Sequence, residues 1–75
     1  MDELTRKFGI RLKRLRTESH LTQEQLALMI GVSKKYVSNI ENGRGNPTLT
    51  TIEKFARGLD VTASELLDGV DSKTS

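Results

Sequence analysis

Five polar side chains with the chemistry needed to contact nucleic-acid bases lie close together between positions 33 and 39. They are Ser33, Lys34, Lys35, Ser38 and Asn39. Lysine can donate hydrogen bonds to guanine O6 and N7, and asparagine can form two hydrogen bonds with adenine N6 and N7. If the segment is helical, these side chains lie on its outward face, because Val37 and Ile40 form an apolar inward face. A helix of this kind fits a major groove about 12 Å wide, and Lys34 and Asn39 are the expected base readers.

The chain has few of the groups that enzymes and metal sites use. It has no cysteine and a single histidine, His20, which excludes thiolate nucleophiles, disulfides and cysteine-type metal ligands. No nucleophile–base pair, phosphate-binding glycine loop or cluster of metal ligands appears at usable spacing. We therefore expect a protein that is not an enzyme and that needs no metal or other cofactor.

The apolar segments are too short for a bilayer-spanning helix. The longest unbroken apolar run covers only residues 26–30, whereas a spanning helix needs about 20 apolar residues. Asp2 and Glu3 directly after Met1 give the N-terminus the wrong charge for a signal peptide. We therefore expect a cytoplasmic protein with no membrane partner.

Charge is distributed unevenly along the chain. Residues 1–46 carry nine Lys/Arg and five Asp/Glu, whereas residues 47–75 carry three and five. Six bases and no acid lie between Arg6 and Arg16. A basic N-terminal part favours a polyanionic partner, although a basic run taken alone is more often a solvated helix face.

The elements that must position these side chains are helices. Leu4, Phe8, Leu12 and Leu15 recur every three or four residues, which predicts an amphipathic helix over about residues 3–18. Four further helices are expected to begin after the N-cap residues Thr22, Ser33, Thr48 and Thr62 and to end near Gly31, Asn42, Leu59 and Asp68. No period-two alternation indicates a strand, so the fold class is all-α.

The connection between the second and third helices is only Gly31-Val32-Ser33. So short a turn, with a glycine able to adopt positive φ, makes two helices cross steeply, as in a helix-turn-helix unit. The inward-facing apolar residues of the first four helices are expected to form one core: Leu4, Phe8, Leu12, Leu15, Leu26, Ala27, Ile30, Val37, Ile40, Leu49, Ile52, Phe55, Ala56 and Leu59.

Several short strings share a further pattern. They are residues 21–27 (LTQEQLA), 31–33 (GVS), 36–38 (YVS), 40–43 (IENG) and 47–49 (PTL). This pattern strongly resembles the Cro/repressor-type (XRE) helix-turn-helix family, and the spacing is most similar to the small controller proteins of restriction–modification systems. The resemblance implies a compact five-helix lambda-repressor-like domain that binds double-stranded DNA. Controller proteins usually have Arg-Thr before the tyrosine, where this chain has Lys34-Lys35, so the preferred bases cannot be transferred.

The resemblance also implies roles for residues outside the base-reading face. Arg16 and Glu41 are expected to form a structural ion pair that joins the first helix to the reading unit. Helix N-termini and loops favour anions because their backbone N–H groups are exposed. The residues expected to contact DNA phosphates are Thr22, Gln23, Tyr36, Asn42 and Arg44, and a phosphate contact is an equal alternative to base reading for Lys35.

Apolar residues near the C-terminus predict self-association. Val61, Leu66, Leu67 and Val70 lie beyond the main core, and we expect an isologous homodimer through the fifth helix and its preceding loop. Such a dimer would bind a pseudo-palindromic operator with half-sites about one helical turn apart. Residues 1–70 are expected to form the DNA-binding domain, and residues 71–75 a flexible tail.

The sequence therefore predicts a dimeric, sequence-specific, double-stranded DNA-binding regulator of transcription. A controller protein would act as activator and repressor, and activation would need a contact with RNA polymerase, for which Glu53, Asp60 or Glu65 are candidates. Two alternatives stay open. In the first, the chain would be a phage- or plasmid-type repressor or the DNA-binding half of one. In the second, it would be an antitoxin-type module that neutralises a protein partner.

Overall fold

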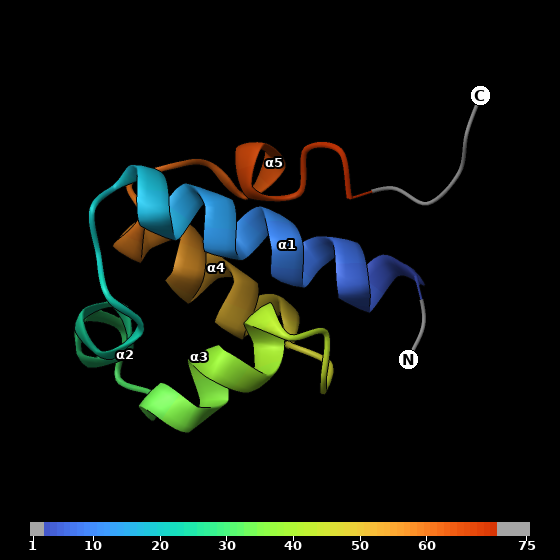
Figure 1. Cartoon of the computed structure of the whole chain (residues 1–75). Coiled ribbons are helices and arrows are strands. Elements are labelled where there is room, and N and C mark those ends of the chain that lie inside the picture. The colour runs from blue at the N-terminus through green and yellow to red at the C-terminus, as the bar shows by residue number, and fades with distance from the viewer. Residues whose placement is uncertain (1–2, 71–75) are drawn as a thin grey trace.

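The computed structural model describes residues 3–70, and this part of the chain is all-α with five helices (Figure 1). The helices are α1 (Glu3–Glu18), α2 (Gln23–Ile30), α3 (Lys34–Glu41), α4 (Leu49–Gly58) and α5 (Ala63–Leu66). The expected tail at 71–75 lies outside the described residues. The fifth helix is shorter than expected, because only Ala63–Leu66 is helical and a series of turns follows. No helix among residues 3–70 is long and apolar enough to cross a membrane.

Polar N-caps fix where four of the helices begin. In each case the cap hydroxyl accepts a hydrogen bond from the backbone N–H of the third helical residue, as the sequence predicts. The cap residues are Thr22, Ser33, Thr48 and Thr62. Two of them, Thr22 and Thr62, form complete capping boxes with Gln25 and Glu65. The hydrogen bond from the Thr62 backbone N–H, together with the one at its side chain, holds the pKa of Glu65 below its usual value.

The turn between α2 and α3 has the geometry that the short connection predicts. Gly31 adopts a left-handed conformation with φ of 77°, and the carbonyl oxygen of Ala27 accepts hydrogen bonds from the N–H groups of both Gly31 and Val32. The chain then enters α3 through Ser33, its N-cap. The two helices pack directly against each other and form the helix-turn-helix unit.

The core lies between α4 and the other helices. Its largest fully buried side chains are Phe55, Leu12, Leu26, Ile40, Leu66 and Val37. Phe55 contacts two aromatic rings, with ring centroids 6.4 Å from both Phe8 and Tyr36. Figure 1 shows α3 and α5 on opposite sides of α1, so the helix-turn-helix unit and the C-terminal helix occupy different faces of the domain.

The prediction that Leu49 and Leu4 belong to the core is wrong. Leu49 is 82% exposed because it is the first residue of α4, and the buried stripe of that helix comprises Phe55 and Ala56. Leu4 is 53% exposed, since it lies in the first turn of α1 at the rim of a groove rather than beneath another helix. Both residues fit the apolar spacing of their helices, but each lies in a helix turn that no other element covers.

Candidate nucleic-acid interface

The outward face of α3 carries the side chains expected to read bases. Val37 and Ile40 are buried, Lys34 and Lys35 are exposed, and Ser38 and Asn39 are half-buried beside them. The fifth expected base reader, Ser33, has a second role, because its Oγ accepts the Tyr36 N–H at 3.0 Å as the N-cap of the helix. The helical phase of α3 therefore brings together the two lysines, a hydroxyl and an amide on one accessible face.

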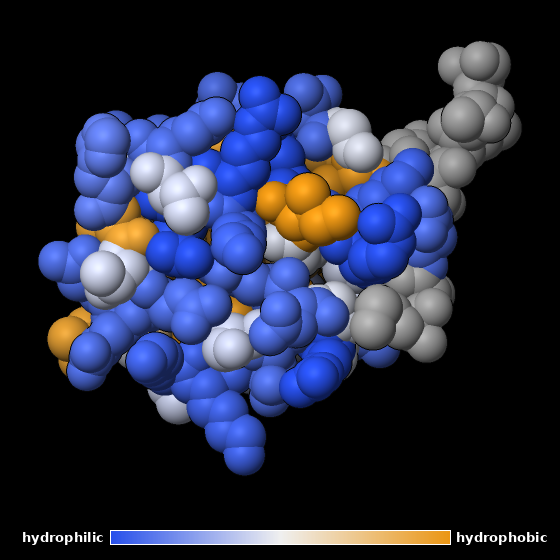
Figure 2. Space-filling model, viewed as in Figure 1, coloured by the Kyte–Doolittle hydropathy of each residue, from blue (hydrophilic) through white to orange (hydrophobic). Residues whose placement is uncertain are grey.

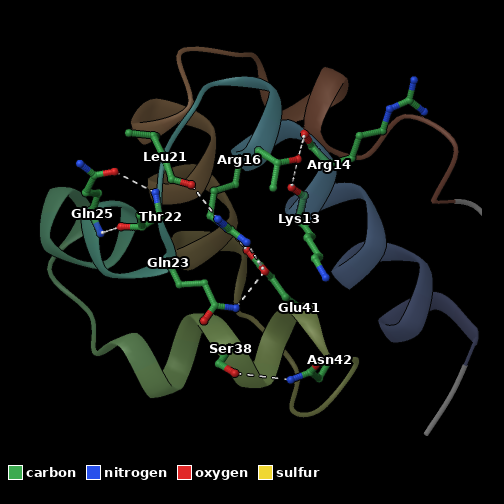
Figure 3. Close-up of polar contacts among 11 residues, drawn as sticks. Lys13, Arg14, Arg16, Leu21, Thr22, Gln23, Gln25, Ser38, Glu41 and Asn42 are labelled. Atoms are coloured by element: carbon green, nitrogen blue, oxygen red, sulfur yellow. Dashed lines mark hydrogen bonds and ion pairs between the residues drawn. The ribbon is translucent and has the colours of Figure 1, made fainter.

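The residues expected to contact phosphates lie at the start of α2, within α3 and in the segment just after α3. Thr22 and Gln23 begin α2, and Asn42 caps the C-terminus of α3, where its Nδ2 donates to the Ser38 Oγ at 3.4 Å (Figure 3). Arg44 is exposed in the loop that follows. Tyr36 is half-buried and its ring stacks on Phe55 at an interplanar angle of 8°, so much of this side chain belongs to the core.

A buried ion pair joins α1 to α3, as expected. The Arg16 Nε and Nη2 donate to the two carboxylate oxygens of Glu41 at 2.6 and 3.0 Å, and the two side chains are only 9% and 2% exposed. The Arg16 Nη1 donates to the Leu21 carbonyl oxygen at 2.6 Å, so the same guanidinium also holds the segment that precedes α2. The two parallel hydrogen bonds form a bidentate ion pair in which each buried charge has a partner of opposite sign.

One contact of this ion pair reaches the proposed DNA surface and could not be foreseen from the sequence. The Gln23 Nε2 donates to the Glu41 Oε1 at 3.1 Å. A carboxylate can only accept hydrogen bonds, so Glu41 fixes which side of the Gln23 amide faces inward. Figure 3 shows Arg16, Gln23 and Glu41 meeting where α1, α2 and α3 converge.

Gly9 brings α1 unusually close to α3. A Cβ atom at this position would lie 2.4 Å from the Ile40 carbonyl oxygen and 2.8 Å from the Glu41 carbonyl oxygen. Only glycine permits this approach of a helix to a backbone. The sequence analysis did not single out Gly9, although a glycine inside a helical pattern is a known sign of close packing.

Most cations of α1 already have a partner. Arg6 and Lys7 pair with Glu3, Arg14 pairs with Glu18, and Arg11 donates to the Glu65 carbonyl oxygen. The hydrogen bond and charge of Arg6 lower the pKa of Glu3, and those of Glu3 raise the pKa of Arg6. Arg16 pairs with Glu41, and Arg57 on α4 pairs with Glu53. The remaining Lys and Arg side chains within residues 3–70 form none of these contacts: Lys13, Lys34, Lys35, Arg44 and Lys54.

The expected dimer residues do not form one exposed surface. Leu66 is completely buried and Val70 is 2% exposed, so both belong to the core of this chain and cannot contact a partner. Val61 is half-buried against the same core, and Leu67 is 39% exposed. Leu67 borders two shallow grooves of about 410 and 390 Å³, which Leu4 and Leu49 respectively also line.

The surface around α1, α2 and α3 is otherwise mostly hydrophilic (Figure 2). In this view hydrophobic atoms appear only as small separate areas. Within residues 3–70, no group of three or more histidine, cysteine or acidic side chains is placed to hold a metal ion.

Known proteins match this chain over most of its length. A family model described as helix-turn-helix matches residues 12–66. Control protein C.MunI from Mycoplasma sp is 39% identical, over 97% of this chain and all of its own. The crystal structure of the restriction–modification controller protein C.AhdI from Aeromonas hydrophila is 44% identical with a TM-score of 0.80, over 84% of this chain and 94% of that chain.

A third relative was solved with DNA. The C.Esp1396I controller tetramer in complex with its natural 35 base-pair operator is 28% identical with a TM-score of 0.84, over 93% of this chain and 92% of that chain. Matches of this extent in sequence and in fold cover the turn, the outward face of α3 and the Arg16–Glu41 pair. The chain belongs to the helix-turn-helix family.

Proposed function

We propose that this chain is a dimeric, sequence-specific regulator of transcription that binds double-stranded operator DNA, as a controller protein of a restriction–modification system. One observation carries the proposal: α2 and α3 are joined by a tight turn at Gly31, and the start of α2 is held against the end of α3 by the hydrogen bond from Gln23 to Glu41 at 3.1 Å, while the polar residues of α3 stay accessible. In a helix-turn-helix, this arrangement inserts the second helix into the major groove while the first contacts the backbone.

The relatives support the controller role in particular. C.MunI spans the same length as this chain, and C.Esp1396I is a controller that binds an operator as a tetramer. The proposed activity is binding and not catalysis, and it needs no cofactor. It places the protein in the cytoplasm with its DNA, and an additional contact with RNA polymerase would allow activation as well as repression.

The proposal is tested by selection from a randomised duplex library at near-physiological salt, followed by sequencing of the retained DNA. We expect a palindrome whose half-sites lie about one helical turn apart. A single enriched half-site would contradict the dimer, and the absence of any enriched sequence would contradict sequence-specific DNA binding and favour a protein partner.

Lys34 and Asn39 are proposed as the principal base readers, with Ser33, Lys35 and Ser38 beside them. We expect Lys34→Ala and Asn39→Ala each to cost about 1–3 kcal/mol of binding to the selected operator and to relax the preference at one base position. Competition binding against operators changed at single positions measures both effects. Lys54→Ala on α4 is the matched control and should leave base preference intact; an unchanged preference in Asn39→Ala would contradict the assignment of α3.

Thr22, Gln23, Asn42 and Arg44 are proposed to contact phosphates beside the major groove that α3 would occupy. The N-terminus of α2 offers backbone N–H groups to an anion. Arg44 is exposed in the loop that follows α3. Tyr36 would contribute through the part of its side chain that the core leaves accessible. These contacts position the protein on DNA without selecting a sequence.

The dimer is proposed to form through Leu67, Leu49 and Leu4 instead of through Leu66 and Val70. These three side chains are 39%, 82% and 53% exposed, and they border the grooves between α1, α4 and α5. Val61 is half-buried against the core and lines neither groove, so it is not part of this surface. An isologous contact here leaves α3 of both protomers free, because α3 and α5 lie on opposite sides of α1 (Figure 1).

Leu49→Glu is expected to convert the dimer to monomer without destabilising the fold. Leu49 is largely exposed in one chain, so the substitution removes few intramolecular contacts, whereas a dimer contact would bury a charge without a partner. We expect the dimer dissociation constant to rise by about tenfold or more, measured by sedimentation equilibrium. Leu28→Glu, on the similarly exposed side of α2, is the control, and an equal effect of both variants would exclude the proposed surface.

A further inference from the structure

Lys13 differs from the other bases of α1 in having no partner among residues 3–70. Arg6, Lys7, Arg11, Arg14 and Arg16 all contact a carboxylate or a carbonyl oxygen. Apart from the backbone hydrogen bonds of the helix, Lys13 forms one hydrogen bond within residues 3–70, through its backbone carbonyl oxygen, which accepts from the Thr17 hydroxyl. Its side chain is exposed, so the ammonium group is accessible to an anion.

Lys13 lies on the face of α1 that packs against the C-terminal end of α3. Residues separated by three or four positions share a helix face, so Lys13 lies on the same face as Gly9 and Arg16. Gly9 approaches the last carbonyl groups of α3, and Arg16 binds Glu41 at the same end. Figure 3 shows the Lys13 side chain extending from α1 toward the end of α3 that carries Glu41 and Asn42.

We infer that Lys13 is a further DNA contact, in which the ammonium group of α1 binds a backbone phosphate beside the groove occupied by α3. The inference rests on the proposed function. It extends the phosphate-binding surface from α2 and the loop after α3 onto the first helix, which lies outside the helix-turn-helix unit. A lysine is suited to this role because its ammonium group acts as a compact charge for phosphate without reading bases.

Close packing explains why this one base is directed to DNA. The contact at Gly9 brings the α1 backbone against α3, so a long side chain one turn further along can pass the edge of α3. Arg14, the next residue, lies about 100° further around the helix and pairs with Glu18 away from α3. Adjacent bases on one helix therefore have different tasks.

The salt dependence of binding tests the inference. Each phosphate contact contributes about 0.9 to the slope of log K against log salt concentration. The proposed dimer carries two copies of Lys13, so we expect Lys13→Gln to lower the slope by about 1.8, and wild type to lose about 12-fold more affinity than the variant between 50 and 200 mM salt. The loss should be equal for operator and unrelated duplex, since a phosphate contact carries no sequence information.

Two control variants remove a positive charge elsewhere. Arg14→Gln removes a paired base from the same helix, and Lys54→Gln removes an unpaired base that lies on α4 beside Arg57 and Gly58. Both should keep the wild-type slope, and thermal unfolding should show all three variants to be folded. A slope for Lys13→Gln equal to that of the controls overturns the inference alone, whereas failure of wild type to bind duplex DNA overturns the proposed function as well.

Discussion

Gly9→Ala is expected to lower the free energy of unfolding by about 2 kcal/mol. The new Cβ would lie 2.4 Å from the Ile40 carbonyl oxygen, and the obstructing atoms belong to the backbone, which cannot rotate away as a side chain can. Overpacking of this kind forces backbone shifts that cost about 1–3 kcal/mol and occasionally more, whereas alanine gains only about 1 kcal/mol over glycine in helix propensity. Because a domain of this size is only marginally stable, such a loss is a large part of its total.

The measurement is urea unfolding followed by far-ultraviolet circular dichroism. Gly58→Ala in α4 is the comparison, because its Cβ would meet side-chain atoms and not backbone, the Ile30 Cγ2 at 2.7 Å and the Leu26 Cδ1 at 3.2 Å. Side chains can adjust where the backbone cannot, so we expect a smaller loss in that variant, about 1 kcal/mol. Equal unfolding free energies for the two variants would show that α1 does not approach α3 as closely as described.

Glu41→Ala is expected to destabilise the domain by about 3–5 kcal/mol. It leaves the Arg16 guanidinium buried without its carboxylate, and an uncompensated buried charge costs far more than the intact pair contributes. DNA binding would then be lost through unfolding, without any contact between Glu41 and DNA. A binding assay alone would wrongly place this residue among the base readers.

Two comparisons separate the effects of charge burial from those of DNA contact. Glu53→Ala breaks an exposed pair with Arg57 at 3.6 Å and should change the unfolding free energy by less than about 0.5 kcal/mol. The double variant Arg16→Met with Glu41→Leu removes both charges and should be less destabilised than Glu41→Ala. If Glu41→Ala unfolds like wild type but no longer binds DNA, the purely structural role of Glu41 is wrong.

Local patterns predicted the elements of this fold well. The capping residues Thr22 and Thr62 and the turn at Gly31 act over a few neighbouring residues, so the sequence alone determines most helix boundaries. Contacts between distant segments were harder to predict from the sequence. Leu66 and Val70 are apolar residues beyond the predicted core, but the sequence could not distinguish a surface for a partner from the core of the same chain, where the structure places them.

The candidate site shows the same division. The residues of α3 share an outward face because helical phase requires it, and the ion pair of Arg16 with Glu41 agrees with the family resemblance. The hydrogen bond from Gln23 to Glu41 and the approach at Gly9 join residues 18 or more than 30 positions apart. No local rule in a single sequence predicts such pairs, because they depend on how the helices cross.

The Arg16–Glu41–Gln23 network determines how α3 can be redesigned. The ion pair holds α3 by its last residue, whereas the proposed base readers precede it at exposed or half-buried positions outside the core. Libraries randomised at Lys34, Lys35, Ser38 and Asn39 should therefore yield mostly folded proteins with new operator preferences. Separating the attachment of a helix from its readout in this way makes one scaffold retargetable to many DNA sequences.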